Sequence, residues 1–287
     1  IGNLVWEDLN NDGIVDAGEP GFDSVEVVLY KAGPDGQKGT SDDIEIGRDT
    51  TNSNGHYQFV DLYPGDYFVK LNSGIPAHYA SSTGEGIVLA DGSGTYEPAA
   101  DPDANINDND DGTQMGNPDG SLMIMSDLVS LHLYDEPTND GDVDSTTNLS
   151  VDFGLFETMS IGNLVWEDLN NDGVADASEP RMNDIVVTLF KDGGDGVKMS
   201  ADDINMGNDT TVNGAYLFDN LYPGDYYLKI SDLPFGMISS TGEGVTIITG
   251  TGTYEPATDP DATDTDSDDS GSQMGYGDTA MVMSDLV

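Results

Sequence analysis

The chain has 287 residues, with 55 Asp or Glu against only 8 Lys or Arg, and its formal net charge is −47. This length allows one or two domains that each bury a core, and the apolar residues sit in short patterned runs, which argues against disorder. The charge excludes nucleic acid and anionic membrane surfaces as expected partners, because both are polyanionic.

Short runs of β-branched and aromatic residues, bounded by Gly, Pro, Asn or Asp, predict strands. In chain order these runs are residues 1–7, 25–30, 57–62, 67–71, 86–90 and 149–156. "YPGDY" predicts a tight turn, since Pro64 presets φ and Gly65 accepts a positive φ. No window of about 12 residues shows a helical stripe, so the sequence predicts an all-β sandwich.

An internal repeat dominates the chain. "IGNLVWEDLNNDG" occurs at 1–13 and again at 161–173, and "LYPGDY" occurs at 62–67 and again at 221–226. Later motifs recur at nearly the same offset, so we interpret the chain as two copies of one domain.

We predict a first domain over residues 1–156, a short linker at 157–160 and a second domain over 161–287. The second copy stops at the counterpart of Val129, so nothing in it corresponds to "VDFGLF" (151–156). The first residue is not Met and no signal-like start is seen, so we expect a mature or internal fragment. No apolar run approaches about 20 residues, and no membrane insertion is expected in this fragment.

Residues 8–19, "DLNNDGIVDAGE", have the ligand spacing of an EF-hand calcium loop. Every ligand position carries an oxygen donor: Asp8, Asn10, Asp12, the carbonyl of Ile14, Asp16 and Glu19. The second copy repeats the set as Asp168, Asn170, Asp172, the carbonyl of Val174, Asp176 and Glu179. Pro20 and Pro180 follow directly, where an exiting helix needs a backbone N–H, so we predict a calcium loop between strands. The alternative is an acidic surface turn without an ion.

Two further acidic groups repeat. The first comprises Asp35, Asp42 and Asp43, matched by Asp195, Asp202 and Asp203, and either a second ion site or a solvated loop explains it. The second comprises Asp101, Asp103, Asp108, Asp110 and Asp111, matched by Asp259, Asp261, Asp264, Asp266, Asp268 and Asp269. Carboxylates this dense repel one another, so we predict a bound cation in the second group. Hard oxygen donors without Cys or His favour calcium over zinc or copper.

Little in the sequence indicates catalysis. No nucleophile elbow or phosphate-binding Gly loop occurs, and the three His residues have no counterparts in the second copy. Paired carboxylates leave an acid/base hydrolase open by residue type, but calcium ligands and solvated loops explain them better, and we expect no enzyme. Trp6 and Trp166 are interpreted as core anchors rather than sugar-binding platforms.

The motifs "IGNLVWEDLNNDGIVDAGEPGFDSVEVVLY", "NGHYQFVDLYPGDYFVKL" and "VDFGLF" occur in an order that resembles the B domain of serine–aspartate repeat surface adhesins, the SdrD B-like family. The resemblance implies tandem CnaB-like, prealbumin-type β-sandwiches with Greek-key topology and several calcium ions per domain. It also implies a place in the stalk of a bacterial surface protein, and hence an extracellular or cell-surface location. A Lys–Asn isopeptide, which some CnaB-like domains carry, is not expected because the first 30 residues contain no Lys.

Two functions remain open. The chain is a structural spacer in a calcium-rigidified stalk or filament, or it is an adhesin region that binds a host, polysaccharide or mineral surface. Near-identical copies favour the spacer. The expected partners are calcium and neighbouring copies of the domain. Either the parent chain continues and supplies the strand that the second copy lacks, or a neighbouring molecule donates that strand and builds a filament.

Overall fold

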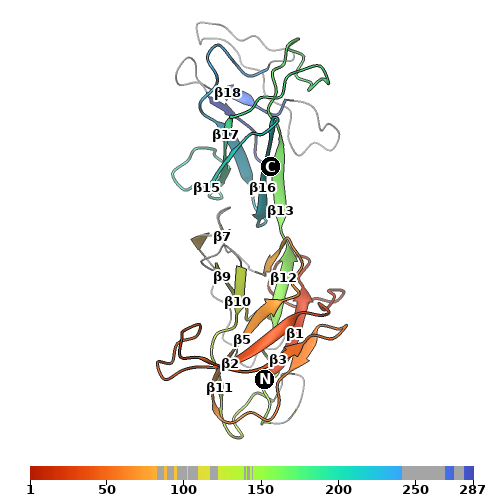
Figure 1. Ribbon diagram of the computed structural model, residues 1–287, viewed down its shortest axis with the longest axis vertical. Helices are drawn as coiled ribbons and strands as arrows, with labels where there is room; N and C mark the ends of the chain where they lie inside the picture. Colours follow the sequence, from red (N-terminus) through yellow and green to blue (C-terminus); the bar gives the residue numbers. More distant parts are fainter. Residues whose placement is uncertain are drawn as a thin grey trace. The chain divides into compact units, whose positions relative to one another are not determined.

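The computed structural model describes residues 1–82, 87–88, 94–95, 102, 109–116, 122–138, 140, 143, 145–240, 269–274 and 281–287. These residues form β-strands and no helix, which confirms the all-β class (Figure 1). The chain divides into two compact units, unit 1 (Ile1–Met159) and unit 2 (Ser160–Val287). Within the described residues, no helix is long and apolar enough to cross a membrane.

Unit 1 is built from two main sheets. The first has the order β4 (His56–Gln58), β1 (Gly2–Glu7), β12 (Phe153–Glu157) and β6 (Tyr79–Ser81). The second has the order β3 (Ile44–Thr50), β2 (Glu26–Lys31), β5 (Gly65–Ser73), β10 (Leu122–Met125) and β9 (Thr113–Gly116), and β11 (Val129–Leu131) also pairs with β5. A small hairpin joins β7 (Ile87–Val88) to β8 (Gly94–Thr95).

The core of unit 1 lies between its two main sheets. The first sheet contributes Val5 and Leu155, and the second contributes Val27, Val69 and Leu71. Along β5, Tyr67, Val69 and Leu71 belong to this core at every second position, and Phe68 between them is also buried. Each fully buried aliphatic side chain contributes about 1.5–3 kcal/mol relative to an exposed one. The β-sandwich that the sequence predicts is therefore confirmed.

The two central strands of the first sheet, β1 and β12, come from the beginning and the end of unit 1 in sequence. β1 and β12 run parallel, with Val5 opposite Phe153 and Glu7 opposite Leu155, and they lie side by side in Figure 1. Trp6 beside them is fully buried, which confirms its role as a core anchor. A Cβ at Gly154 would lie 2.8 Å from the Trp6 ring, so the indole fits only against glycine.

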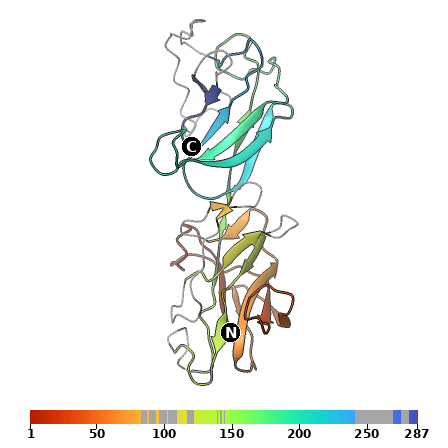
Figure 2. The same ribbon diagram turned by 90° about the vertical axis from the view of Figure 1, so that its left-hand side faces the viewer.

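Unit 2 repeats the second sheet more completely than the first. Its larger sheet has the order β15 (Ile204–Thr210), β14 (Val186–Lys191), β17 (Tyr226–Ile230), β19 (Met281–Met283) and β18 (Ser272–Met274). Figure 2 shows its cyan and blue ribbons side by side. Among the described residues of this unit, the smaller sheet pairs β13 (Met159–Leu164) with β16 (Ala215–Leu221).

Unit 2 has a groove along β13 and the residues that follow it. A cavity of about 870 Å³ is lined by Val165, Trp166, Ile185, Ile230 and Ser240 among others. Val165 and Trp166 are half-buried, whereas their counterparts Val5 and Trp6 are fully buried.

Several strands differ in extent from the predicted runs. The run at 57–62 ends as a strand at Gln58, whereas its counterpart in unit 2 continues as β16 to Leu221. The sequence pattern did not predict the polar strand β3 or the short strands β6, β9, β10 and β11, because they lack a strong apolar alternation. Of the four residues at 157–160, only Thr158 lies outside a strand.

The predicted turn after Tyr63 is present. Gly65 has a φ of +152°, and the Tyr67 hydroxyl donates a 2.7 Å hydrogen bond to the Tyr63 carbonyl across the turn. In unit 2 the Tyr226 hydroxyl donates to the Tyr222 carbonyl at 2.6 Å. The two units therefore build this turn in the same way.

Candidate cation-binding loops

The acidic side chains of the loop at residues 8–19 accept hydrogen bonds from the backbone of the same loop. Asp8 accepts hydrogen bonds from the backbone nitrogens of Gly13 at 2.8 Å and Asp12 at 3.3 Å. Asn10 accepts from the Asp12 nitrogen at 3.2 Å, and Asp12 accepts from the Ile14 nitrogen at 3.0 Å. Gly13 has a φ of +73°, which glycine adopts without strain. The side-chain oxygens of the first half of the loop are thus held in place by backbone donors.

Glu19 closes the same loop with both carboxylate oxygens. Its Oε1 accepts from the Leu9 nitrogen at 2.9 Å, and its Oε2 accepts from the Asp16 nitrogen at 2.8 Å. Asp16 in turn accepts from the Asn10 amide at 3.4 Å. A carboxylate oxygen has more than one lone pair, so these bonds leave capacity for a cation.

The loop at residues 168–179 repeats this geometry. Asp168 accepts from the Gly173 nitrogen at 2.8 Å, and Glu179 accepts from Leu169 at 2.8 Å and from Asp176 at 3.0 Å. Burial opposes ionisation of Asp168, but hydrogen bonds led by the Ser240 hydroxyl and the Gly173 nitrogen hold its pKa below the usual value. Asp168 is therefore a carboxylate at neutral pH.

Strands, not helices, flank these loops. β1 precedes the first loop, and the Glu7 nitrogen donates to the Pro20 carbonyl at 2.8 Å where the chain returns. Trp6 and Gly21 then pair in an antiparallel bridge, and Trp166 and Arg181 do the same in unit 2. The loops lie between two extended segments, as the prolines predict.

The acidic segment around Asp110 packs directly on the first loop. The Asp110 nitrogen donates to the Gly13 carbonyl at 2.9 Å, and Asn109 pairs with Ile14 in an antiparallel bridge. The Ser82 hydroxyl also donates to Asp8. In unit 2 the Asp269 nitrogen donates to the Gly173 carbonyl at 2.7 Å, and the Ser240 hydroxyl donates to Asp168.

Asp8 is buried, Asp110 is half-buried, and the charge of Asp8 acts on Asp110. Asp110 Oδ1 accepts from the nitrogens of Gly112 at 2.9 Å and Gly154 at 3.1 Å. Burial raises the pKa of Asp110 well above its usual range, and the charges of Asp8 and Asp152 raise it further, although those hydrogen bonds lower it. None of the ion pairs in the described part of the chain involves Asp8 or Asp110. A cation would satisfy both carboxylates.

The remaining residues of the second acidic group fall in two classes. Asp111 accepts from the Asp152 nitrogen at 2.9 Å and pairs its segment with the strand-like stretch before β12. The other predicted ligands lie outside the described residues: Asp101, Asp103, Asp108, Asp259, Asp261, Asp264, Asp266 and Asp268.

The first acidic group differs between the two units. In unit 1, Asp43 accepts from the nitrogens of Gly33 and Thr40, and Asp42 accepts from the nitrogen of Asp35. In unit 2, oxygens of Asp192, Asp195 and Asp203 all lie within 4.8 Å of one another.

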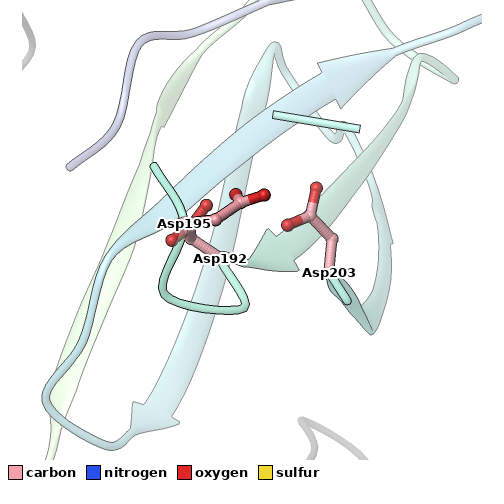
Figure 3. A group of neighbouring side chains, drawn as sticks. All are labelled: Asp192, Asp195 and Asp203. Carbon is pink, nitrogen blue, oxygen red and sulfur yellow. The ribbon is translucent and has the colours of Figure 1, made fainter. Parts of the chain in front are cut away.

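Figure 3 shows Asp192 and Asp195 beside each other, with Asp203 facing them from the other end of the loop. Asp202, a predicted ligand, instead accepts from the Ser200 hydroxyl and is not in this group. Asp192 was not among the predicted residues. Its position directly after β14, ahead of the Asp195–Asp203 loop, is the sequence signal that could have found it.

The donor set of the two long loops fits calcium. Each loop offers carboxylate, amide and backbone oxygens at the spacing of a calcium loop, with no nitrogen or sulfur ligand. The residues that would hold the ion are Asp8, Asn10, Asp12, Ile14, Asp16 and Glu19, and their counterparts in unit 2. Bound calcium would supply positive charge at the centre of each loop.

Two all-β units that carry oxygen-lined loops define a β-sandwich repeat module. The sequence matches the SdrD B-like domain family over residues 1–117 and 159–283, so the chain belongs to that family. This membership confirms the resemblance drawn from the motifs, and it confirms an extracellular or bacterial cell-surface location.

Similar proteins come from staphylococci. The chain is 30% identical over 283 residues to the bone sialoprotein-binding protein of Staphylococcus aureus, covering 96% of this chain and 18% of that protein. It is also 30% identical over 243 residues to the serine-aspartate repeat-containing protein I of Staphylococcus saprophyticus, covering 84% of this chain and 10% of that protein. The chain thus spans less than a quarter of the length of these relatives.

Similarity to solved structures is weak. The shaft pilin SpaA of Lactobacillus rhamnosus GG aligns with a TM-score of 0.28 at 12% identity, covering 82% of this chain and 88% of the pilin. A minor pilin of Streptococcus agalactiae aligns with a TM-score of 0.28 at 16% identity, covering 82% of this chain and 84% of that pilin. We base no argument on scores this low.

Proposed function

We propose that the chain is a non-catalytic structural region of a surface protein, in which calcium stabilises each unit and stiffens a stalk or filament. The observation that carries the proposal is the loop closed by Glu19 and by Glu179, which has the same hydrogen bonds in both units. Two loops of nearly identical sequence, with the same hydrogen bonds in both units, support a structural role better than a catalytic one.

The energetic role of calcium follows from mass action. A site at a thousandfold excess of ion over its dissociation constant contributes about 4 kcal/mol to stability. An ordinary domain has about 5–15 kcal/mol in total. Loss of calcium would therefore remove a large share of the stability of a unit, and a stalk built of such units would be stiff only when loaded.

Thermal melting of the full chain with calcium and with a chelator tests this proposal. We expect a large loss of stability in chelator, together with a more expanded chain in small-angle scattering. Equal melting curves in calcium and in chelator would refute the calcium role.

A second candidate function is ligand binding by an adhesin. One similar protein is named for binding bone sialoprotein, and this chain aligns with it over 96% of its length. The chain would then bind a host, polysaccharide or mineral surface. Retention of the calcium-loaded chain on an immobilised ligand, measured against a chain carrying Glu19→Gln and Glu179→Gln, distinguishes this function from the spacer.

Neighbouring copies of the chain are the proposed protein partner. The groove of unit 2 lies where β12 lies in unit 1, and residues 149–157 of another copy have the sequence that fills this position. Donation of that strand would link copies into a filament.

A further inference from the structure

We propose that the β14–β15 loop of unit 2 binds a calcium ion through Asp192, Asp195 and Asp203, and that the corresponding loop of unit 1 has no such site. This site is separate from the loops at 8–19 and 168–179 and goes beyond the function proposed above. It would make the two repeats unequal in their cation content.

Asp192 is a buried carboxylate at the end of β14. Its backbone nitrogen donates to the Asp225 carbonyl at 2.9 Å, which fixes the residue at the end of β14. The side chain is only 8% exposed. Its Oδ2 accepts from the nitrogens of Gly194 at 2.8 Å and Gly196 at 3.1 Å, while its Oδ1 has no hydrogen-bond partner. A buried carboxylate oxygen without a partner is unfavourable unless a cation satisfies it.

Asp203 faces Asp192 and is held as a carboxylate. It accepts from the Ser200 nitrogen at 3.0 Å and from the Tyr227 hydroxyl at 2.7 Å. Its other oxygen accepts from the Gly193 nitrogen at 3.3 Å and from the Ser200 hydroxyl at 3.2 Å. Donors on both oxygens therefore hold the Asp203 side chain in place within the group.

Asp195 completes the group from the loop between them. Its Oδ1 accepts from the Val197 nitrogen at 2.8 Å, and the residue is exposed. An exposed third ligand leaves a route for the ion and room for water molecules. Calcium takes six to eight oxygen ligands, so three carboxylates and several waters suit it.

The lysines nearest in sequence do not neutralise the group. Lys198 Nζ donates to the Ser284 carbonyl at 2.8 Å and pairs with Asp285 at 3.0 Å. Lys191 Nζ donates to the Pro223 carbonyl at 3.4 Å and lies over the Tyr226 ring. Both ammonium groups are engaged elsewhere, and the carboxylate group keeps its negative charge.

Unit 1 shows what the same loop looks like without these features. Ala32 stands in place of Asp192, and Phe68 stands in place of Tyr227. The loop still forms, since Asp43 accepts from the nitrogens of Gly33 at 3.0 Å and Thr40 at 2.7 Å. Asp192 is therefore not needed to fold the loop. A purely structural brace would explain the bonds to its Oδ2 but would leave its Oδ1 without a role.

Calcium titration calorimetry on the full chain tests the proposal, with Asp192→Asn as the main variant. Asparagine keeps an acceptor oxygen for the nitrogens of Gly194 and Gly196 but removes the charge and the second oxygen. Asp202→Asn is the matched control, because that carboxylate lies outside the group. We expect Asp192→Asn and Asp192→Ala each to bind one calcium ion fewer than the wild type, and Asp202→Asn to bind the same number.

A second measurement reports on this site directly. Terbium emission sensitised by Tyr227 should fall in Asp192→Asn and persist in the double variant Glu19→Gln/Glu179→Gln. Unchanged stoichiometry and unchanged terbium emission in Asp192→Asn would overturn this inference and leave the loops at 8–19 and 168–179 intact. A wild-type chain that binds no calcium at all would overturn both this inference and the proposed function.

Discussion

The backbone nitrogen of Asp110 donates a 2.9 Å hydrogen bond to the carbonyl of Gly13, although 97 positions separate them along the chain. The same bond joins Asp269 to Gly173 at 2.7 Å in unit 2. This bond places the residues around Asp110 against the turn of the loop at residues 8–19. Carboxylates that are distant in sequence therefore lie together in one candidate cation site in each unit.

If Asp110 is a cation ligand, substitution of Asp110 should change the stability of unit 1 in opposite directions with and without calcium. Replacing Asp110 with Asn removes an ionisable group beside Asp8, and Asn can still accept from Gly112 and Gly154. Without calcium, Asp110→Asn should stabilise unit 1, because burial raises the pKa of Asp110 and folding therefore disfavours its charged form. With calcium, the same variant should be less stable than the wild type because a ligand is lost.

Denaturant unfolding of the full chain, in chelator and in calcium, checks the sign of the change in stability. The matched substitution outside the site is Asp61→Asn, since Asp61 is exposed and Asn220 occupies its place in unit 2. If Asp110→Asn destabilised the chain equally in both conditions, Asp110 would be a structural acceptor and not a cation ligand.

Removal of calcium should lower the melting temperature by tens of degrees. Each site contributes about 4 kcal/mol at a thousandfold excess of ion, and 1 kcal/mol shifts the melting temperature of a domain of about 100 residues by roughly 4–8 °C. Magnesium should restore the melting temperature poorly, because it requires a near-ideal octahedron and keeps its water. Scanning calorimetry in chelator, followed by return of each ion, measures both effects. Full recovery with magnesium would contradict the prediction.

Glu19→Gln should weaken the first loop more than any other single substitution in it. Both Glu19 oxygens are oriented into the loop by the Leu9 and Asp16 nitrogens, at 2.9 and 2.8 Å. Glutamine keeps one acceptor oxygen but presents an amide donor to the ion in place of the other. Titration calorimetry should show one tight site fewer, and Glu179→Gln should do the same for the second loop.

The sequence predicted the fold class and the two long loops because both depend on local patterns. A short run of β-branched and aromatic residues marks β5, and the spacing from Asp8 to Glu19 marks the loop before any tertiary contact is known. No local sequence pattern indicates which distant residues pair in the fold. Nothing near Asp110 in the sequence indicates that its nitrogen meets Gly13 or that its carboxylate meets Gly154.

Asp192 was missed for a related reason. Its value as a candidate ligand comes from burial at the end of β14 and from an oxygen that no donor reaches, and neither property is visible in a linear pattern. Asp202 was predicted together with Asp203, yet it lies in a bend, where it accepts from the Ser200 hydroxyl and stays outside the group. Only the folded loop shows which of the two carboxylates faces Asp192.

The last prediction concerns the groove of unit 2. Val5 and Trp6 are fully buried beside β12, whereas Val165 and Trp166 are half-buried beside a cavity of about 870 Å³. In this chain unit 2 should therefore unfold before unit 1. Fluorescence of the two single-tryptophan variants, Trp6→Phe and Trp166→Phe, follows each unit separately during a melt, and the transition reported by Trp166 should come at the lower temperature.

A peptide with the sequence of residues 149–157, "LSVDFGLFE", should bind this groove and raise the lower transition. In unit 1 the Asp152 carboxylate accepts from the Leu4 nitrogen at 3.0 Å, which sets the register, and Phe153 and Leu155 fill the core. Burial of each of these two side chains contributes about 1.5–3 kcal/mol. Trp166 emission should shift to shorter wavelength as the peptide covers the indole. A peptide with Phe153→Asp is the control, and equal effects of the two peptides would rule out strand donation into the groove.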